Sequence, residues 1–110
     1  MNAHEELTEY LEDGEVIQGI VFGAFGWDGF GEPQPPLVPS NKRGVVLSFE
    51  EAKPYMVGWS FYGGFGHPKC YACYIWTDKR VIWVTQYDGA TNLDSAPRNP
   101  INIVPDMSGG

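Results

Sequence analysis

His67, Cys70 and Cys73 are the residues whose types and spacing come closest to metal chemistry. Two thiolates and an imidazole suit Zn²⁺, but a structural zinc site uses four protein ligands. No second CxxC or HxxH pair completes the set, and His4 is the other histidine of the chain. In a strand over 70–76 the two cysteines would also point to opposite faces, because their separation is odd. We therefore expect no metal site and no cofactor, and two half-buried cysteines that pack as small apolar side chains.

Catalytic constellations are missing from the rest of the sequence. Gly63–Gly66 is rich in glycine but lacks the Gly-Lys-Ser/Thr ending of a phosphate-binding loop. A nucleophile would need His67 or His4 as its base, and no triad pattern includes either. Acidic residues could converge as a glycosidase pair, although their spacing does not argue for it. These residues are Asp28, Glu32, Asp88 and Asp94. We expect a protein that is not an enzyme; an enzyme using Asp88, His67 or Arg98 is the least favoured alternative.

Aromatic side chains next to glycines and turns give the strongest binding signal. The chain has four Trp, six Tyr and six Phe, and a core of this size has room for about half of them. Exposed aromatics with a few fixed polar groups bind a partner protein, a base or a sugar. The predicted binding residues are Trp27, Trp59, Tyr62, Phe65, Trp76, Tyr87, Asp88 and Arg98. Arg98 lies between prolines and is expected to pair with Asp88 or Asp94 or to face a ligand. Ordinary packing stays open as the alternative.

The negative charge is concentrated at one end of the chain. Residues 1–41 hold eight acids and no Lys or Arg, whereas residues 42–110 hold six acids and seven bases. Such a surface disfavours nucleic acid, which needs Lys and Arg for its phosphates. It permits a basic protein partner. Glu5, Glu9 and Glu12 form the predicted acidic surface; a solvated helix face without a partner is the alternative.

Short elements separated by many turns predict the α+β class. Fourteen Gly and nine Pro argue against a helical bundle. The expected elements are an acidic helix over 1–14, a strand over 16–24, a Gly/Pro-rich loop over 25–44, a strand over 45–47, a helix over 49–53, a strand over 58–62 and a β-meander over 70–96. We expect one domain: a twisted, mostly antiparallel sheet of about five strands with one or two short helices.

Three expectations about these elements rest on particular residues. Ser48 and Glu51 form a capping box, and Pro54 is expected to end the helix that follows at Lys53. On the middle strand of the meander, alternate residues share a face. Val81, Trp83, Thr85 and Tyr87 form one set, and Ile82, Val84 and Gln86 form the other. Asp88-Gly89 signals a tight hairpin in which Gly89 needs a positive φ, with a longer loop through Ala90 and Thr91 as the alternative.

The sequence contains no apolar run long enough to span a membrane. Its first residues, M-N-A-H-E-E, are acidic where a secretory signal peptide is basic. We expect a cytoplasmic protein that does not contact membranes. The sequence leaves open whether the exposed aromatics meet a second copy of the chain.

The run W-T-D-K-R-V-I-W-V-T-Q-Y-D-G-A-T from Trp76, followed by S-A-P-R-N-P from Ser95, resembles small uncharacterised proteins of phages and other mobile elements. Gly58–Gly66 and the closing P-D-M-S-G-G fit the same pattern, so the resemblance covers about residues 45–110. It brings no catalytic residues with it. It implies a small accessory protein, and such proteins often antagonise a host defence system.

The resemblance and the missing catalytic residues together favour a non-enzymatic inhibitor of a host defence protein, such as a CRISPR effector. It would act in the host cytosol through an aromatic and acidic surface. The second hypothesis is a sponge that sequesters a nucleotide signal. It would use a pocket of Trp59, Tyr62, Trp76 and Arg98, with Gly63–Gly66 facing the phosphate.

Overall fold

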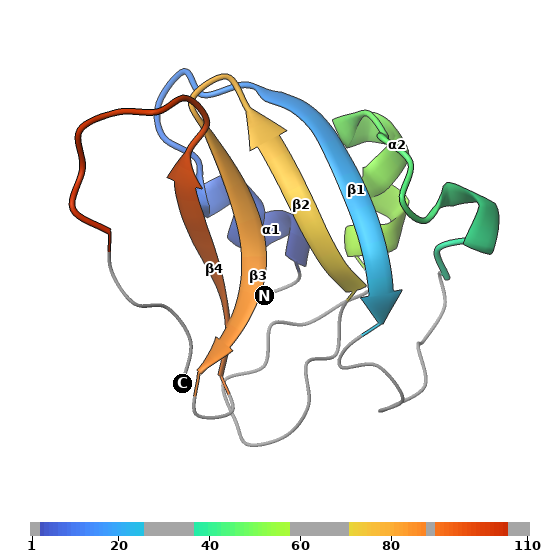
Figure 1. The fold of residues 1–110 in the computed structure, drawn as a ribbon. Coiled ribbons are helices and arrows are strands. Elements are labelled where there is room, and N and C mark those ends of the chain that lie inside the picture. Colours follow the sequence, from blue (N-terminus) through green and yellow to red (C-terminus); the bar gives the residue numbers. More distant parts are fainter. Residues whose placement is uncertain (1–2, 26–36, 58–70, 88–89, 106–110) are drawn as a thin grey trace.

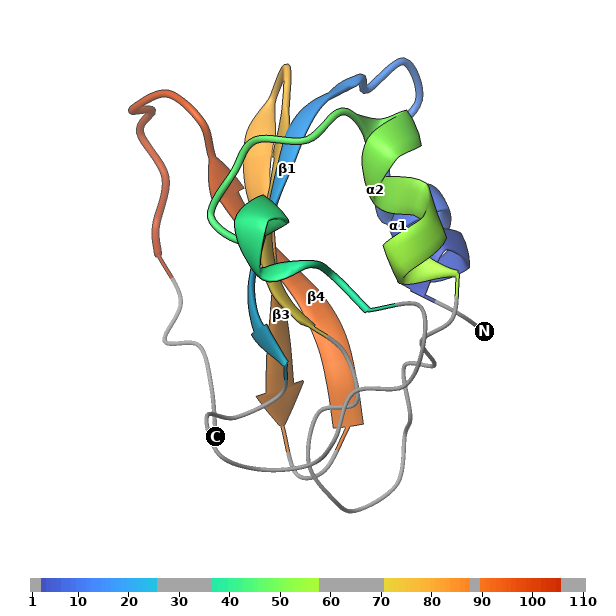
Figure 2. The same cartoon turned by 90° about the vertical axis from the view of Figure 1, so that its right-hand side faces the viewer.

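The computed structural model describes residues 3–25, 37–57, 71–87 and 90–105. These residues build an antiparallel sheet with two helices on one of its faces (Figures 1 and 2). The elements are α1 (Ala3–Tyr10), β1 (Ile17–Phe25), the 3₁₀ helix η1 (Ser40–Lys42), α2 (Phe49–Met56), β2 (Tyr71–Thr77), β3 (Arg80–Tyr87) and β4 (Ala90–Pro97). The predictions of an α+β fold, an antiparallel sheet and two short helices are confirmed.

The sheet of the described residues has four strands, in the order β1-β2-β3-β4, rather than about five. Residues 45–47 do not form the predicted strand. Instead Leu47 makes an isolated antiparallel bridge with Ile20, and Arg43 makes an isolated parallel bridge with Phe22. Gly44 has φ +71°, so the chain turns between the two bridges and a ladder cannot extend through it. The strand predicted over 58–62 lies outside the described residues.

The register places rows of side chains across the sheet. Val21 pairs with Tyr74, Tyr74 with Trp83, and Trp83 with Asp94. Tyr87 pairs with Ala90 at the far end of β3. The Asp88-Gly89 hairpin prediction, with its positive φ at Gly89, lies outside the described residues.

The core lies between the sheet and the helices. On β2, Tyr71, Cys73, Ile75 and Thr77 are buried while the residues between them are more exposed, and Ile20, Phe22 and Ile82 are buried on the neighbouring strands. The helices contribute Ala3, Leu7, Ala52 and Met56 to the same cluster. Each fully buried Leu, Ile or Phe contributes about 1.5–3 kcal/mol. This burial fixes which face of the sheet the helices cover.

The sequence predicts the start of α2 correctly but not its end. The capping box of α2 is confirmed: Glu51 N donates to Ser48 Oγ and Ser48 N donates to Glu51 Oε1, each at 3.1 Å. The prediction that Pro54 ends this helix at Lys53 is wrong, since α2 runs to Met56. Met56 is buried, so packing of the last turn on the core outweighs the cost of placing Pro54, which has no backbone N–H to donate, inside the helix. None of the helices in the described ranges is long and apolar enough to cross a membrane.

Helix α1 ends at Tyr10, earlier than the predicted end near Gly14. Gly14 has φ +77°, a conformation that side chains with a Cβ rarely adopt. It lies in the connection that leads from α1 back to β1. The turn at Gly14 therefore directs the chain from the helical layer to the sheet.

Candidate functional site: the open face of the sheet

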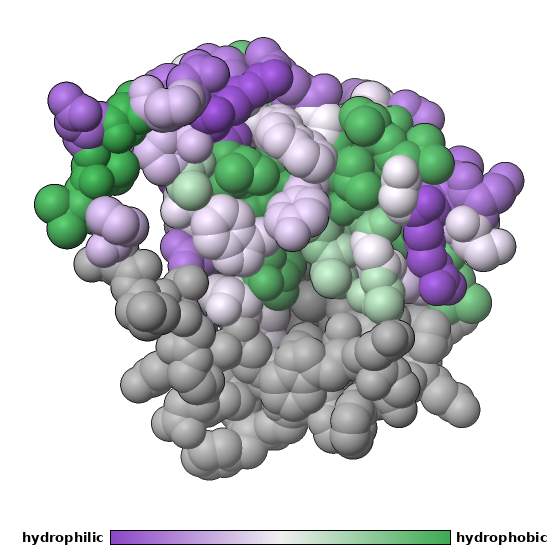
Figure 3. Space-filling model, viewed as in Figure 1, coloured by the Kyte–Doolittle hydropathy of each residue, from purple (hydrophilic) through white to green (hydrophobic). Residues whose placement is uncertain are grey.

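One face of the sheet carries neither helix. Both helices lie on one side of the sheet (Figure 2). Side chains alternate between the two faces of a strand, so the residues between the buried ones belong to the other face. We call this surface the open face. Its members are Val21, Tyr74, Trp76, Val81, Trp83, Thr85 and Asp94. In the space-filling view, pale aromatic and green aliphatic side chains gather on it below a hydrophilic upper rim (Figure 3).

Three large aromatic residues form the centre of the open face. The rings of Tyr74 and Trp76 have centroids 5.8 Å apart and are tilted by 55°. Trp83 is the cross-strand neighbour of Tyr74. Tyr74 is 55% exposed, and both Trp residues are half-buried. Such rings offer a large apolar area with a polar edge, and they lose little side-chain entropy on binding.

Polar groups border these aromatics. Asp94 lies opposite Trp83 in the register, and its Oδ1 accepts a hydrogen bond from Ser95 N at 2.8 Å. At the upper rim, Arg98 donates to Gln18 Oε1 and, at 3.0 Å, to the carbonyl oxygen of Thr77. These contacts differ from the predicted pairing of Arg98 with Asp94. The guanidinium joins the end of β4 to β1 across the β2–β3 turn.

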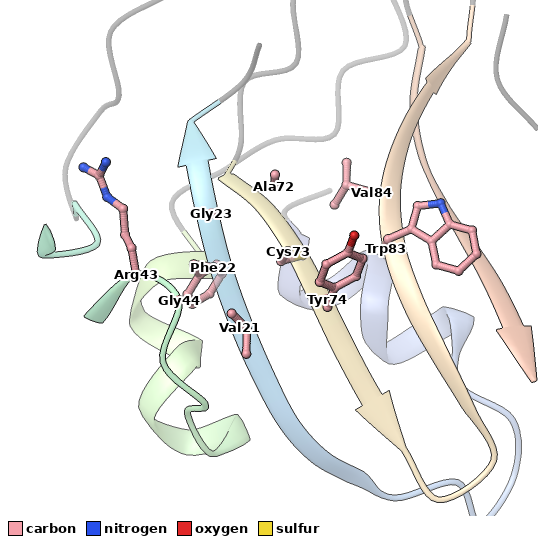
Figure 4. A pocket seen from close by; sticks show the side chains of 10 residues that line it. All are labelled: Val21, Phe22, Gly23, Arg43, Gly44, Ala72, Cys73, Tyr74, Trp83 and Val84. Carbon is pink, nitrogen blue, oxygen red and sulfur yellow. The ribbon is translucent and has the colours of Figure 1, made fainter. Parts of the chain in front are cut away.

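A hollow of about 720 Å³ lies over β1, β2 and β3 beside the chain segment of Arg43 (Figure 4). Small residues, Gly23 and Ala72, line it together with Tyr74 and Trp83. Arg43 is the charged residue among the described lining residues. A hollow of this volume is in the range that holds small molecules.

The structure places only part of the predicted binding set. Trp76 lies on the open face, and Tyr87 lies in β3. Trp27, Trp59, Tyr62, Phe65 and Asp88 are outside the described residues, and so are His67, Cys70 and Gly63–Gly66. Cys73 is buried, with 8% of its surface exposed, rather than half-buried. The described residues contain no cluster of three metal-ligating side chains; the metal, sponge and enzyme hypotheses thus rest mostly on residues that are not described.

The predicted acidic surface belongs to the other layer of the molecule. Glu5 and Glu9 are exposed on α1, which packs on the face opposite the aromatics (Figure 2). Glu12 follows α1, and its carboxylate lies 3.7 Å from Lys79 Nζ. Both of these side chains are about half exposed or more, so this ion pair contributes little to stability. The aromatic and acidic groups therefore face different directions.

Sequence reasoning missed the open-face neighbours Tyr74 and Trp83. The alternation on the middle strand already placed Trp83 on one face with Val81. The same alternation on the preceding strand separates Tyr74 and Trp76 from the buried residues. No sequence pattern predicts the register between β2 and β3, which brings Tyr74 and Trp83 side by side.

Sequence reasoning also missed the buried ion pair of Glu15 and Arg80 at the top of the sheet. Glu15 accepts two hydrogen bonds from the guanidinium of Arg80, and a third from Thr77 Oγ1 at 2.6 Å. The Arg80 hydrogen bonds lower the pKa of Glu15 from 4.5 to about 2, against the opposing effect of burial, with further lowering from Thr77 and Glu12 N. Arg80 also donates to the carbonyl oxygen of Tyr10 at 2.7 Å, and it lies over the Tyr10 ring at 4.5 Å from the centroid. We assign this pair a structural role.

Comparison with protein-family models, with curated proteins and with solved structures finds no match.

Proposed function

We propose that this protein is a small non-enzymatic binding protein that inhibits a host defence protein, with the open face as its contact surface. The observation that carries the proposal is the gathering of Tyr74, Trp76 and Trp83 on a sheet face that the helices leave uncovered. The phage-type resemblance supports the class of target. A CRISPR effector is one such target.

The chemistry of the open face suits a protein partner. Tyr and Trp are enriched among the residues that dominate binding energy at protein interfaces, where they lie near the centre and are surrounded by polar groups. Here Asp94 and Arg98 border the aromatic centre. The strands hold these side chains in place, so little freedom is lost when a partner binds. An inhibitor needs no more chemistry than this, because occupying a surface of the target is enough to block it.

The acidic residues of α1 support the proposal in a second way. Glu5 and Glu9 are exposed on α1, which lies on the other side of the sheet from the open face, so they are not required to touch the same partner surface. Their field can still accelerate the approach of a basic partner, as charges outside an interface do. The aromatics thus hold the partner, and the acids speed its arrival.

Affinity capture from a bacterial host lysate tests the proposal. The tagged protein is compared with the double variant Tyr74→Thr/Trp83→Thr, in which threonine keeps the strand propensity. Val57→Thr is the matched control, because Val57 is an exposed apolar residue on the helical layer. A stoichiometric partner that the protein and the control retain, and the double variant loses, supports the proposal. Equal capture by the folded double variant would contradict it.

A further inference from the structure

We infer that the hollow beside Arg43 is a binding site for a planar aromatic molecule that carries a carboxylate or phosphate. This inference concerns a small ligand, and the hollow shares Tyr74 and Trp83 with the open face proposed above to bind a protein. It rests on the shape of the hollow, on the aromatic side chains along it and on the charge at its rim. Each of these points restricts the ligand in a different way.

The shape favours a flat ligand. Gly23 has no side chain, and a Cβ placed on it would lie 3.7 Å from the Cβ of Ala72. Two small residues on adjacent strands therefore leave a low area in the surface. In Figure 4 the Tyr74 ring lies in front of β2 beside this low area, whereas the Trp83 indole extends from β3 toward β4. A ring laid on the low area can contact an aromatic side chain at its edge or face.

Residues 43–47, which form the rim of the hollow, are held in place by backbone hydrogen bonds. Gly44 N donates to the carbonyl oxygen of Phe22 at 2.8 Å. Leu47 and Ile20 exchange two further bonds, of 2.8 and 2.9 Å, a few residues along. These bonds fix residues 43–47 along β1, and with them the base of the Arg43 side chain. The rim is thus part of the fold at this edge of the sheet.

The charge at the rim selects an anion. Arg43 is exposed, and no acidic residue is among the described lining residues. Its guanidinium carbon lies 5.8 Å from the ring centroid of Tyr71. Lys42 adds nothing to this charge, because its Nζ lies 5.9 Å from the ring centroid of Tyr55 on α2. Arg43 therefore supplies the positive charge, and a guanidinium binds carboxylate and phosphate well.

Two sources of such a ligand exist, a nucleotide and an aromatic acid. The probes are therefore adenosine 5′-monophosphate with adenosine as its neutral counterpart, and indole-3-acetate with indole as its neutral counterpart. Binding is measured by calorimetry and by amide chemical shifts in the full chain. We expect at least one anion to bind with shifts around Gly23, Ala72 and Tyr74, and more tightly than its neutral counterpart. The pair that shows this effect identifies the source.

Two variants probe charge and shape separately. Arg43→Gln should weaken binding of the anion by about three- to tenfold and leave the neutral probe unchanged. Gly23→Val should weaken both probes, because it fills the low area. Lys53→Gln on α2 is the control and should change neither. Equal affinity of the Arg43→Gln variant and the unaltered protein for the anion would overturn the inference. So would the absence of binding by all four probes, or shifts located elsewhere on the protein.

Discussion

The guanidinium of Arg80 and the carboxylate of Glu15 form a bidentate ion pair, with Nε–Oε2 and Nη2–Oε1 distances of 2.9 Å. The Glu15 side chain is fully buried, and the Arg80 side chain is 15% exposed. The pair joins the connection after α1 to the start of β3. It therefore holds the helical layer on the sheet whose other face is open.

Removing one partner of this pair should destabilise the fold strongly. Glu15→Gln leaves the Arg80 guanidinium without its counter-charge, and breaking a buried pair costs about 3–5 kcal/mol. Urea denaturation measures this free energy of unfolding. The control is Glu12→Gln, which removes the exposed partner of Lys79 and should cost less than about 1 kcal/mol. Similar losses in both variants would show that the buried pair does not anchor the layer.

The same pair predicts how stability depends on pH. Because the pKa of Glu15 falls from 4.5 to about 2 on folding, chiefly through the Arg80 hydrogen bonds, its contribution is fully present above about pH 4.5. It is lost as the pH falls from there through 2. The difference in pKa corresponds to about 3 kcal/mol. Urea titrations at several pH values should therefore show the advantage of the unaltered protein over Glu15→Gln shrinking as the solution is acidified. An advantage that stays constant down to pH 2.5 would contradict this assignment.

A side chain at Gly19 on β1 should displace Val46. A Cβ on Gly19 would lie 2.8 Å from Val46 Cγ1, closer than such atoms approach. Val46 is 67% exposed, so its side chain can move, and Gly19→Ala should cost about 0.5–1.5 kcal/mol of stability through a forced change of the Val46 rotamer. Val46→Ala in the same chain should restore most of this stability. Thermal unfolding measures both changes. Gly23→Ala is the matched control, because its Cβ would meet Ala72 at an ordinary 3.7 Å. A double variant as unstable as Gly19→Ala alone would mean that Val46 is not the obstacle.

Reversing the acids of the helical layer should change the rate of association rather than the lifetime of the complex. We expect the triple variant Glu5→Lys/Glu9→Lys/Glu12→Lys to slow binding of the captured partner and to flatten its dependence on salt, with the dissociation rate nearly unchanged. Surface plasmon resonance at several salt concentrations separates these rates. A faster dissociation as the main effect would place the acids inside the interface instead.

Strand alternation is the part of the structure that the sequence predicts best. The apolar and β-branched residues of β2 and β3 predict the two faces, and Ile82 is buried while Val81 and Trp83 of the other set are more exposed. The alternation could not reveal that Tyr74 and Trp83 are neighbours, because register depends on turn geometry and on the partner strand. Glu15 and Arg80 are 65 residues apart in the chain, so no local sequence pattern predicts that they form an ion pair. The extension of α2 beyond Pro54 depends on tertiary packing, which local propensity does not contain.

Phage infection tests the central claim most directly. Cells that carry one defined defence system, such as a CRISPR effector, express the protein, the Val57→Thr control or the Tyr74→Thr/Trp83→Thr variant, and are challenged with a phage that the system restricts. We predict that the protein and the control restore plaque formation against at least one system of a panel. The double variant should fail although it accumulates in folded form. Full restoration by the folded double variant, or no restoration by the protein against any system of the panel, would contradict the account.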